Sequence, residues 1–226
     1  MKAVLLHAFP LDERMWEPQL SALEGYVVVA PSLYDLGGNS IDGWAERILD
    51  EVEGDLVAVG ASMGGYVALA MARQSPERIR GLLLAGSRPD ADSAERRAGR
   101  AGTIELIERE GAQGIWENQR EKLFAKEPPV GAKEMALSRD NDELVRGVES
   151  LRDRSDSSGL LPSLQIPVVF ALGASDPFFP VEEARAFAEQ APLGSLVVFE
   201  HSRHLPNLEQ TAEFNQMLLE LLGSVG

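Results

Sequence analysis

Short, almost wholly apolar runs recur along the chain, separated by segments with helical spacing. Strands that are covered on both faces have this continuous apolar character, whereas strands with one face exposed to solvent alternate between apolar and polar residues. The runs interpreted as strands are 3–7, 26–30, 55–60, 81–86, 167–173 and 195–200. The helical patterns are 41–53, with Ser40 as N-cap, then 63–74, 181–190 and 207–222. This alternation predicts an α/β fold, a doubly wound, mostly parallel sheet of about six strands.

One long segment, residues 88–158, interrupts the alternation, because it is rich in charge and contains no convincing strand. Its apolar positions are typical of amphipathic helices, and "EPPVG" at 127–131 separates two of them. These positions include Ile104, Leu106, Ile107, Ile115, Trp116, Leu123 and Phe124. We therefore expect an α/β core formed by 1–87 and 159–226, with 88–158 inserted as a helical cap. The cap either covers a sheet edge or forms a lid over a substrate pocket.

Composition excludes several classes of protein. There is no Cys, so disulfides, thiolate metal sites and a cysteine nucleophile are excluded, and the presence of only three His argues against an all-histidine metal site. A net charge of −15 argues against nucleic acid and anionic membranes as partners, and disfavours anionic substrates unless a local basic group intervenes. The apolar run within residues 1–10 is too short for a secretory signal, and no segment has the length of a membrane span. We therefore expect a cytoplasmic protein.

The stretch "AVGASMGGYVALA" at 58–70 places Ser62 between glycines, after a predicted strand and before a predicted helix. Gly60-Ala61-Ser62-Met63-Gly64 has the G-x-S-x-G spacing of a nucleophile elbow, where a tight strand-to-helix turn needs small neighbours and exposes the serine. An ordinary turn with Ser62 as N-cap would account for the serine but not for all the glycines. The context favours a nucleophile.

A serine nucleophile needs a base, and the base needs an orienting acid. In elbow enzymes the order along the chain is Ser, then Asp or Glu, then His. Asp176 follows the predicted strand 167–173, and His201 and His204 both follow the last predicted strand. The order is satisfied with either histidine.

These features resemble the α/β-hydrolase superfamily along essentially the whole chain, in particular its small esterases, 3-oxoadipate enol-lactonases and cofactor-free haloperoxidases. The matching stretches are "LLHAFPLDERMWEPQL", "GASMGGYVALAMARQSPERIRGLLLAGSRPDAD", "DSSGLLPSLQIPVVFALGASDPFFP" and "HSRHLPNLEQ". The resemblance implies that Asp176 is the acid, and the family's H-x-x-x-x-E pattern, here ending at Glu209, selects His204 as the base. It also places the family's cap at 88–158, between the family's sixth and seventh strands and beside the strand ends that hold the triad, a position that favours a lid.

The resemblance further implies an oxyanion hole formed by the backbone amides of Met63 and Phe9. The family's H-G-x-P corresponds to His7-Ala8-Phe9-Pro10, with Ala8 in place of Gly, which would be strained if that position needed a positive φ. His7 is expected to support this loop through hydrogen bonds. Two more departures are the absent N-terminal hairpin, since the sequence begins at the family's third strand, and "YDLGGNS" at 34–40, which lacks the family's noncatalytic His.

The sequence therefore predicts a serine carboxylesterase with Ser62, Asp176 and His204 as catalytic residues and no metal or cofactor. Its expected partner is a small-molecule ester or lactone, and its oligomeric state is left open. The alternatives are a lactonase, a perhydrolase of the haloperoxidase type, a C–C bond hydrolase or a small-ligand receptor on the same fold. Arg96, Arg97 and Arg100 would offset a substrate carboxylate if they reached the pocket, although arginines on a charged helix are usually solvated.

Overall fold

The computed structural model describes residues 1–226, and its centre is a sheet of six parallel strands in the order β2-β1-β3-β4-β5-β6. The strands are β1 (Lys2–Leu6), β2 (Val27–Val29), β3 (Leu56–Ala61), β4 (Ile79–Ala85), β5 (Val168–Gly173) and β6 (Gly194–Phe199). Every predicted strand is present, with ends displaced by two residues or fewer. All pairings are parallel, so each strand ends at the same edge of the sheet.

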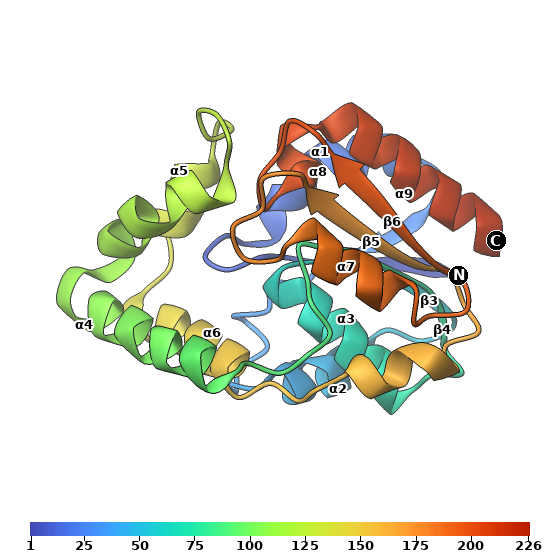
Figure 1. The fold of residues 1–226 in the computed structure, drawn as a ribbon, viewed down its shortest axis with the longest axis horizontal. Helices are drawn as coiled ribbons and strands as arrows, with labels where there is room; N and C mark the ends of the chain where they lie inside the picture. Colours follow the sequence, from blue (N-terminus) through green and yellow to red (C-terminus); the bar gives the residue numbers. More distant parts are fainter.

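Helices cover both faces of the sheet (Figure 1). One face carries α2 (Ile41–Glu51), α3 (Met63–Gln74) and α7 (Val181–Ala188), and the other carries α1 (Glu17–Leu20), α8 (Pro206–Glu209) and α9 (Thr211–Val225). Short 3₁₀ turns, η1 (Glu13–Trp16), η2 (Ser21–Leu23) and η3 (Ser158–Ser163), complete the connections. The Ser40 side chain accepts a hydrogen bond from the Gly43 amide at 3.1 Å, which confirms the predicted N-cap of α2.

Alternate residues of each strand enter two different hydrophobic cores. Val4 and Leu6 pack with α2 and α3, whereas Ala3 and Leu5 pack with η1 and α9. Both faces of the sheet are thus buried from solvent, which explains why the strand sequences are continuously apolar.

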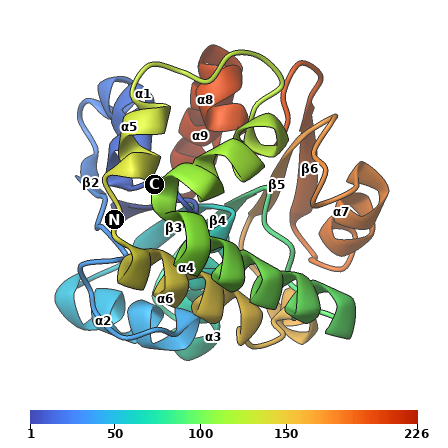
Figure 2. The same cartoon turned by 90° about the vertical axis from the view of Figure 1, so that its left-hand side faces the viewer.

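The helical segment, residues 88–158, lies beyond the carboxyl ends of the strands, which point toward it in Figure 1. It contains α4 (Ala94–Leu123), α5 (Ala132–Leu137) and α6 (Asn141–Arg152). Helix α4 is interrupted at Gly111, which has a φ of 61°, so its two halves run in different directions across the strand ends (Figure 2).

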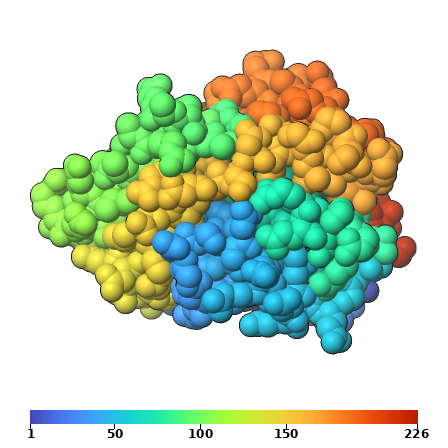
Figure 3. All heavy atoms as spheres, turned by 90° about the horizontal axis from the view of Figure 1, so that it is seen from below, coloured from blue at the N-terminus to red at the C-terminus, as the bar shows by residue number.

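The apolar side of the helical segment joins the cores of the sheet. Ile107, Ile115 and Leu144 belong to the core that contains α2 and α3, and Trp116 and Leu123 to the one that contains α9. Seen from below, the segment and the helices α2 and α3 form one continuous surface (Figure 3). None of the helices in the molecule combines the length and apolar character needed to cross a bilayer.

Candidate active site

Ser62 occupies the turn between β3 and α3, and it is the only non-glycine residue with a positive φ (φ 49°, ψ −111°). Its amide donates to the Ala85 carbonyl at 2.7 Å, and its carbonyl accepts from the Gly65 amide at 3.0 Å. Because backbone contacts on both sides hold this unfavourable conformation, the side chain is directed out of the helix rather than used as a cap.

The glycines around Ser62 allow the close packing that this turn requires. A Cβ at Gly60 would lie 2.3 Å from the backbone of Gly64, and a Cβ at Gly64 would lie 2.0 Å from the Leu6 carbonyl oxygen. At Gly65, a Cβ would lie 2.0 Å from the Ser87 hydroxyl. All three positions therefore exclude any side chain.

Asp176 and His204 are joined by a hydrogen bond of 2.8 Å between Oδ2 and Nδ1, and both side chains are almost completely buried. The other carboxylate oxygen of Asp176 accepts from the amides of Phe178 at 2.8 Å and Phe179 at 3.2 Å. The Phe178 ring packs edge-on against the imidazole, with centroids 4.7 Å apart. The carboxylate and the ring are thus fixed relative to one another.

His201, the other candidate base, is exposed, and its amide donates to the Gln210 side chain. Its ring has no hydrogen-bonding partner within the protein. The structure therefore brings Asp176 together with His204 rather than with His201.

A cavity of about 360 Å³ contains both Ser62 and His204 in its lining. No hydrogen bond joins the Ser62 hydroxyl to the imidazole, and such contacts are often long before substrate binds. Phe9 also lines this cavity, whereas Met63 is the first residue of α3. The amides of Phe9 and Met63 donate to no group in the protein, and Ala8 lacks a positive φ, so alanine at that position is not strained.

His7 supports the loop that carries Phe9, as predicted. Its Nε2 accepts from the Leu33 amide at 2.8 Å, and its Nδ1 lies 3.3 Å from the Ala8 carbonyl oxygen. Burial lowers the pKa of His7 to about 4, so the ring is neutral at pH 7. A neutral ring can accept at Nε2 while it donates at Nδ1, which is the arrangement required here.

Two glycines position the site; Gly173 belongs to the family's G-x-x-D pattern that ends at Asp176, whereas Gly86 was not singled out from the sequence. Gly86, with a φ of 58°, lies so close to the imidazole that a Cβ there would be 2.8 Å from His204 Cε1. At Gly173, a Cβ would lie 1.9 Å from the Arg203 carbonyl oxygen. Gly173 ends β5 and Gly86 directly follows β4, and for Gly86 a glycine at the end of an apolar run was the available signal.

Glu209 links the His204 loop to the helical segment. Its carboxylate accepts from the amides of Ala125 and Arg203, each at 2.7 Å. The amide of His204 itself donates to the Leu123 carbonyl at 3.2 Å. The end of α4 is thus tied to the loop that carries the candidate base.

The helical segment supplies twelve of the eighteen residues that line the cavity. They are Arg88, Asp92, Arg96, Gly99, Arg100, Thr103, Asn118, Gln119, Lys122, Leu123, Leu151 and Arg154. Arg97 points elsewhere, pairs with Asp153 at 2.8 Å and is half-exposed. The solvated interpretation of the α4 arginines is thus right for Arg97 and wrong for Arg96 and Arg100.

No three acidic or histidine side chains converge in a geometry that would hold a metal ion. The site therefore consists of a serine at a strained turn, a buried Asp–His pair, two free backbone amides and a wall of polar side chains from the helical segment.

Comparison with known proteins gives consistent matches. The model of the Alpha/beta hydrolase family matches residues 3–217. The structure of a thermophilic esterase from Thermogutta terrifontis, with malate bound, is 31% identical with a TM-score of 0.92, over 100% of this chain and 90% of that chain. A pimeloyl-[acyl-carrier protein] methyl ester esterase of Aromatoleum aromaticum is 27% identical over 235 residues, 91% of each protein. The enol-lactonase from Burkholderia xenovorans LB400 is 18% identical (TM-score 0.83, 98% of this chain and 90% of that chain) and shares the fold.

Proposed function

Because the chain belongs to the alpha/beta hydrolase family, we propose that it is a serine hydrolase that cleaves carboxylic esters of small molecules through an acyl-enzyme. The observation that carries this proposal is the placement of Ser62, at its strained turn, in the same cavity as His204, whose ring is held by Asp176. The esterases among the related proteins support the same class of reaction.

The proposed first step is attack of Ser62 Oγ on the ester carbonyl carbon. His204 Nε2 takes the hydroxyl proton, because Nδ1 is occupied by its hydrogen bond to Asp176. The buried carboxylate of Asp176 fixes the tautomer and stabilises the imidazolium. Two backbone amides donate to the second oxygen of Asp176, and these hydrogen bonds keep the carboxylate from rotating away from His204.

The negative charge that develops on the carbonyl oxygen requires donors that are already in place. We assign the amides of Phe9 and Met63 to this role, since neither donates elsewhere. His204 then delivers its proton to the leaving alcohol, and the ester C–O bond breaks. The same imidazole then takes a proton from a water molecule, whose oxygen attacks the acyl carbonyl carbon. The bond to Ser62 Oγ breaks, His204 returns the proton to Oγ, and the acid is released. A lactone is a cyclic ester, and the same steps would open it.

The helical segment acts in this proposal as a lid, because it provides most of the cavity wall and none of the reacting groups. The core would then consist of 1–87 and 159–226. Replacing 88–158 by a short linker should change substrate range more than reactivity toward a small activated ester, provided that circular dichroism shows a folded core. Equal loss on all esters would mean that the segment supplies catalytic groups.

The direct test is labelling with a fluorophosphonate followed by peptide mapping. We expect one modification, on Ser62, and loss of hydrolysis in the same proportion. Ser62→Ala should be unlabelled and should hydrolyse p-nitrophenyl butyrate about 10⁴ to 10⁶ times more slowly than the parent. Ser150→Ala is a control at another buried hydroxyl, which lies in α6 away from the turn, and it should still be labelled. Near-parental activity of Ser62→Ala, or labelling at another residue, would refute the assignment.

A further inference from the structure

Five cationic side chains line the cavity that contains Ser62 and His204, although the protein as a whole carries a net charge of −15. We call this set the cationic wall: Arg88, Arg96, Arg100, Lys122 and Arg154. All five belong to the helical segment, and the only carboxylate in the cavity lining is that of Asp92. A strongly acidic protein has thus placed positive charge in its candidate substrate pocket.

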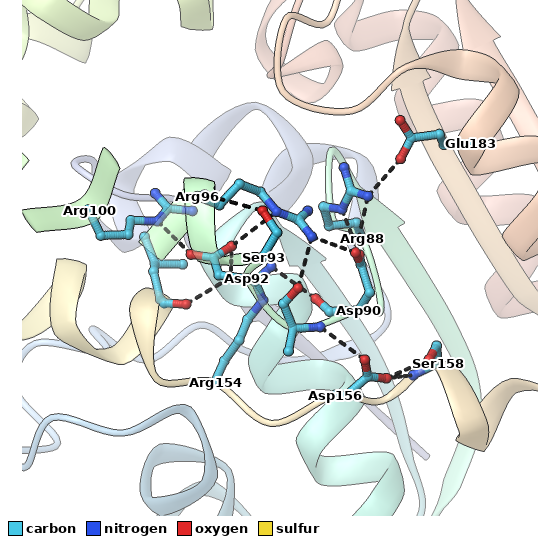
Figure 4. A network of polar contacts seen from close by, with 12 residues as sticks. Arg88, Asp90, Asp92, Ser93, Arg96, Arg100, Arg154, Asp156, Ser158 and Glu183 are labelled. Atoms are coloured by element: carbon cyan, nitrogen blue, oxygen red, sulfur yellow. Dashed lines mark hydrogen bonds and ion pairs between the residues drawn. The ribbon is translucent and has the colours of Figure 1, made fainter. Parts of the chain in front are cut away.

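Two carboxylates, the fully buried Asp92 and the partly buried Asp90, hold part of the cationic wall in place (Figure 4). The fully buried Asp92 carboxylate pairs with Arg154 at 2.7 Å and with Arg100 at 3.0 Å. Asp90 pairs with both Arg88 and Arg96 at 2.6 Å. Burial would raise the pKa of Asp90, but hydrogen bonds from these two arginines outweigh that effect and lower the pKa below its ordinary value. Asp90 is therefore charged at pH 7.

The cationic wall nevertheless has more positive charge than its partners neutralise. Arg88 also pairs with Glu183, so five cations face three carboxylates, and two positive charges remain. A partly enclosed cavity screens such charges less than bulk water does. The surplus favours an anion in the cavity.

Several donors in the cationic wall also lack a partner. Nη1 of Arg96 and Nε of Arg154 are buried without any hydrogen bond. Arg100 donates a hydrogen bond only through Nε, to Asp92, so its two Nη atoms are free. Lys122 Nζ donates only to the Asn118 side chain, at 2.9 Å. Because Arg100 and Lys122 line the cavity, their free donors can bind an acceptor inside it, whereas the two buried nitrogens are closed to solvent.

We propose that the natural substrate carries a free carboxylate in addition to its ester, and that Arg96, Arg100 and Lys122 bind this carboxylate. The inference rests on the proposed function, because it places the ester carbonyl at Ser62 in the same cavity. Arginine forks match the two oxygens of a carboxylate. The cavity of about 360 Å³ suits a small molecule.

The test compares two methyl esters that differ only at the far end of the acyl chain, monomethyl adipate and methyl hexanoate. We expect kcat/KM for the charged ester to exceed that for the neutral ester by about tenfold or more, as befits charge-assisted hydrogen bonds. Arg100→Met and Lys122→Met should each remove part of this preference, lowering it by up to about tenfold, mainly through KM. Arg97→Met, on the same helix but outside the cavity, should leave the preference unchanged. An equal or greater preference for methyl hexanoate in the parent would overturn the proposal.

Binding without turnover separates this inference from the proposed function. In Ser62→Ala, calorimetry should detect monomethyl adipate binding that Arg100→Met, added to the same protein, weakens by about tenfold or more. If the charged ester binds but the parent cleaves neither ester, the proposed function fails and the inference stands. If the parent cleaves methyl hexanoate efficiently and Ser62→Ala does not bind the charged ester, the inference fails and the proposed function stands.

Discussion

The cavity has two walls that are built in different ways. The strand-end wall consists of Ser62, Phe9 and His204 together with the Asp176 that holds the imidazole, and backbone contacts fix it. Ser62 is held by amide and carbonyl bonds, and Asp176 accepts from two amides. Backbone groups have few alternative positions, so this wall keeps atoms where a reaction needs them.

The wall formed by the helical segment is held by long side chains instead. Its arginines reach across to Asp90 and Asp92, and some of their nitrogens remain free. The turn at Ser62 excludes even a methyl group, whereas the wall of the helical segment includes side chains such as Lys122 that line the cavity without an ion-pair partner. The difference suggests that the strand-end wall determines the reaction and the helical segment determines which substrate is accepted.

The largest expected effect concerns the two histidines, which are three residues apart. His204→Ala should lower kcat/KM on an activated ester by about 10⁴-fold or more, because it removes the proposed base. His201→Ala should stay within about tenfold of the parent, about 1.4 kcal/mol, since that ring is exposed and unbonded. Steady-state kinetics on p-nitrophenyl butyrate measures both. Inactivity of His201→Ala alone would contradict the assignment of the strand-end wall.

A smaller effect is expected from the arginines of the helical segment, and it should appear in stability. Arg154→Met removes a buried partner of Asp92 and should lower the free energy of unfolding by about 3 kcal/mol. Arg97→Met breaks a half-exposed pair with Asp153 and should cost less than about 1 kcal/mol. Urea denaturation compares the two variants. Equal costs would mean that the buried network does not anchor the helical segment.

The strand-end wall was largely predictable from sequence, because it depends on local chemistry. Continuous apolar runs gave the six strands, and the glycines around Ser62 gave the turn before α3, whose bounds match the prediction. The family resemblance, confirmed by the match over residues 3–217, supplied the choice of His204, which the structure pairs with Asp176. That these residues are catalytic stays a prediction.

The helical segment was predicted only in outline, because its organisation depends on tertiary contacts. Its content of helices was expected, but α4 spans 30 residues with a change of direction at Gly111, and Asp92 and Arg154 were not recognised as partners 62 residues apart. Helix spacing makes Arg96 and Arg100 neighbours, but Arg97 is three residues from Arg100 and is its neighbour by the same rule, so spacing alone did not separate Arg97 from the other two. The helices at 13–23 were also missed, and the predicted helix 207–222 is divided at Gln210.

The pH dependence of stability tests how the strand-end wall is held at His7, whose ring supports the loop that carries Phe9. Burial lowers its pKa from 6.5 to about 4, so between these values the unfolded chain binds a proton that the folded chain does not. The contribution of the neutral His7 ring to the free energy of unfolding is therefore fully present above pH 6.5, and it is lost progressively as the pH falls toward 4. From the shift, this loss is about 3 kcal/mol.

His7→Gln keeps an acceptor for the Leu33 amide but has no group that titrates in this range. The variant should therefore lack the pH-dependent part of the free energy of unfolding that the His7 ring contributes. Urea denaturation from pH 7.5 to pH 4.5 would compare parent and variant, with circular dichroism at pH 7.5 to verify folding. We expect the parent to lose stability more steeply as the pH falls. Parallel curves would show that the ring at His7 is not held neutral by burial.

The last prediction uses one substitution, glycine to alanine, in both regions. Gly60→Ala puts a Cβ 2.3 Å from the Gly64 backbone and should lower the free energy of unfolding by about 1–3 kcal/mol, with loss of activity as Ser62 shifts. Gly102→Ala on α4 meets no atom within 4 Å and should raise stability by about 0.5–1 kcal/mol through helix propensity. Urea denaturation and kinetics on both variants test the contrast. If Gly60→Ala were tolerated as well as Gly102→Ala, close backbone packing would not be what holds Ser62, and the distinction between the two walls would lose its physical basis.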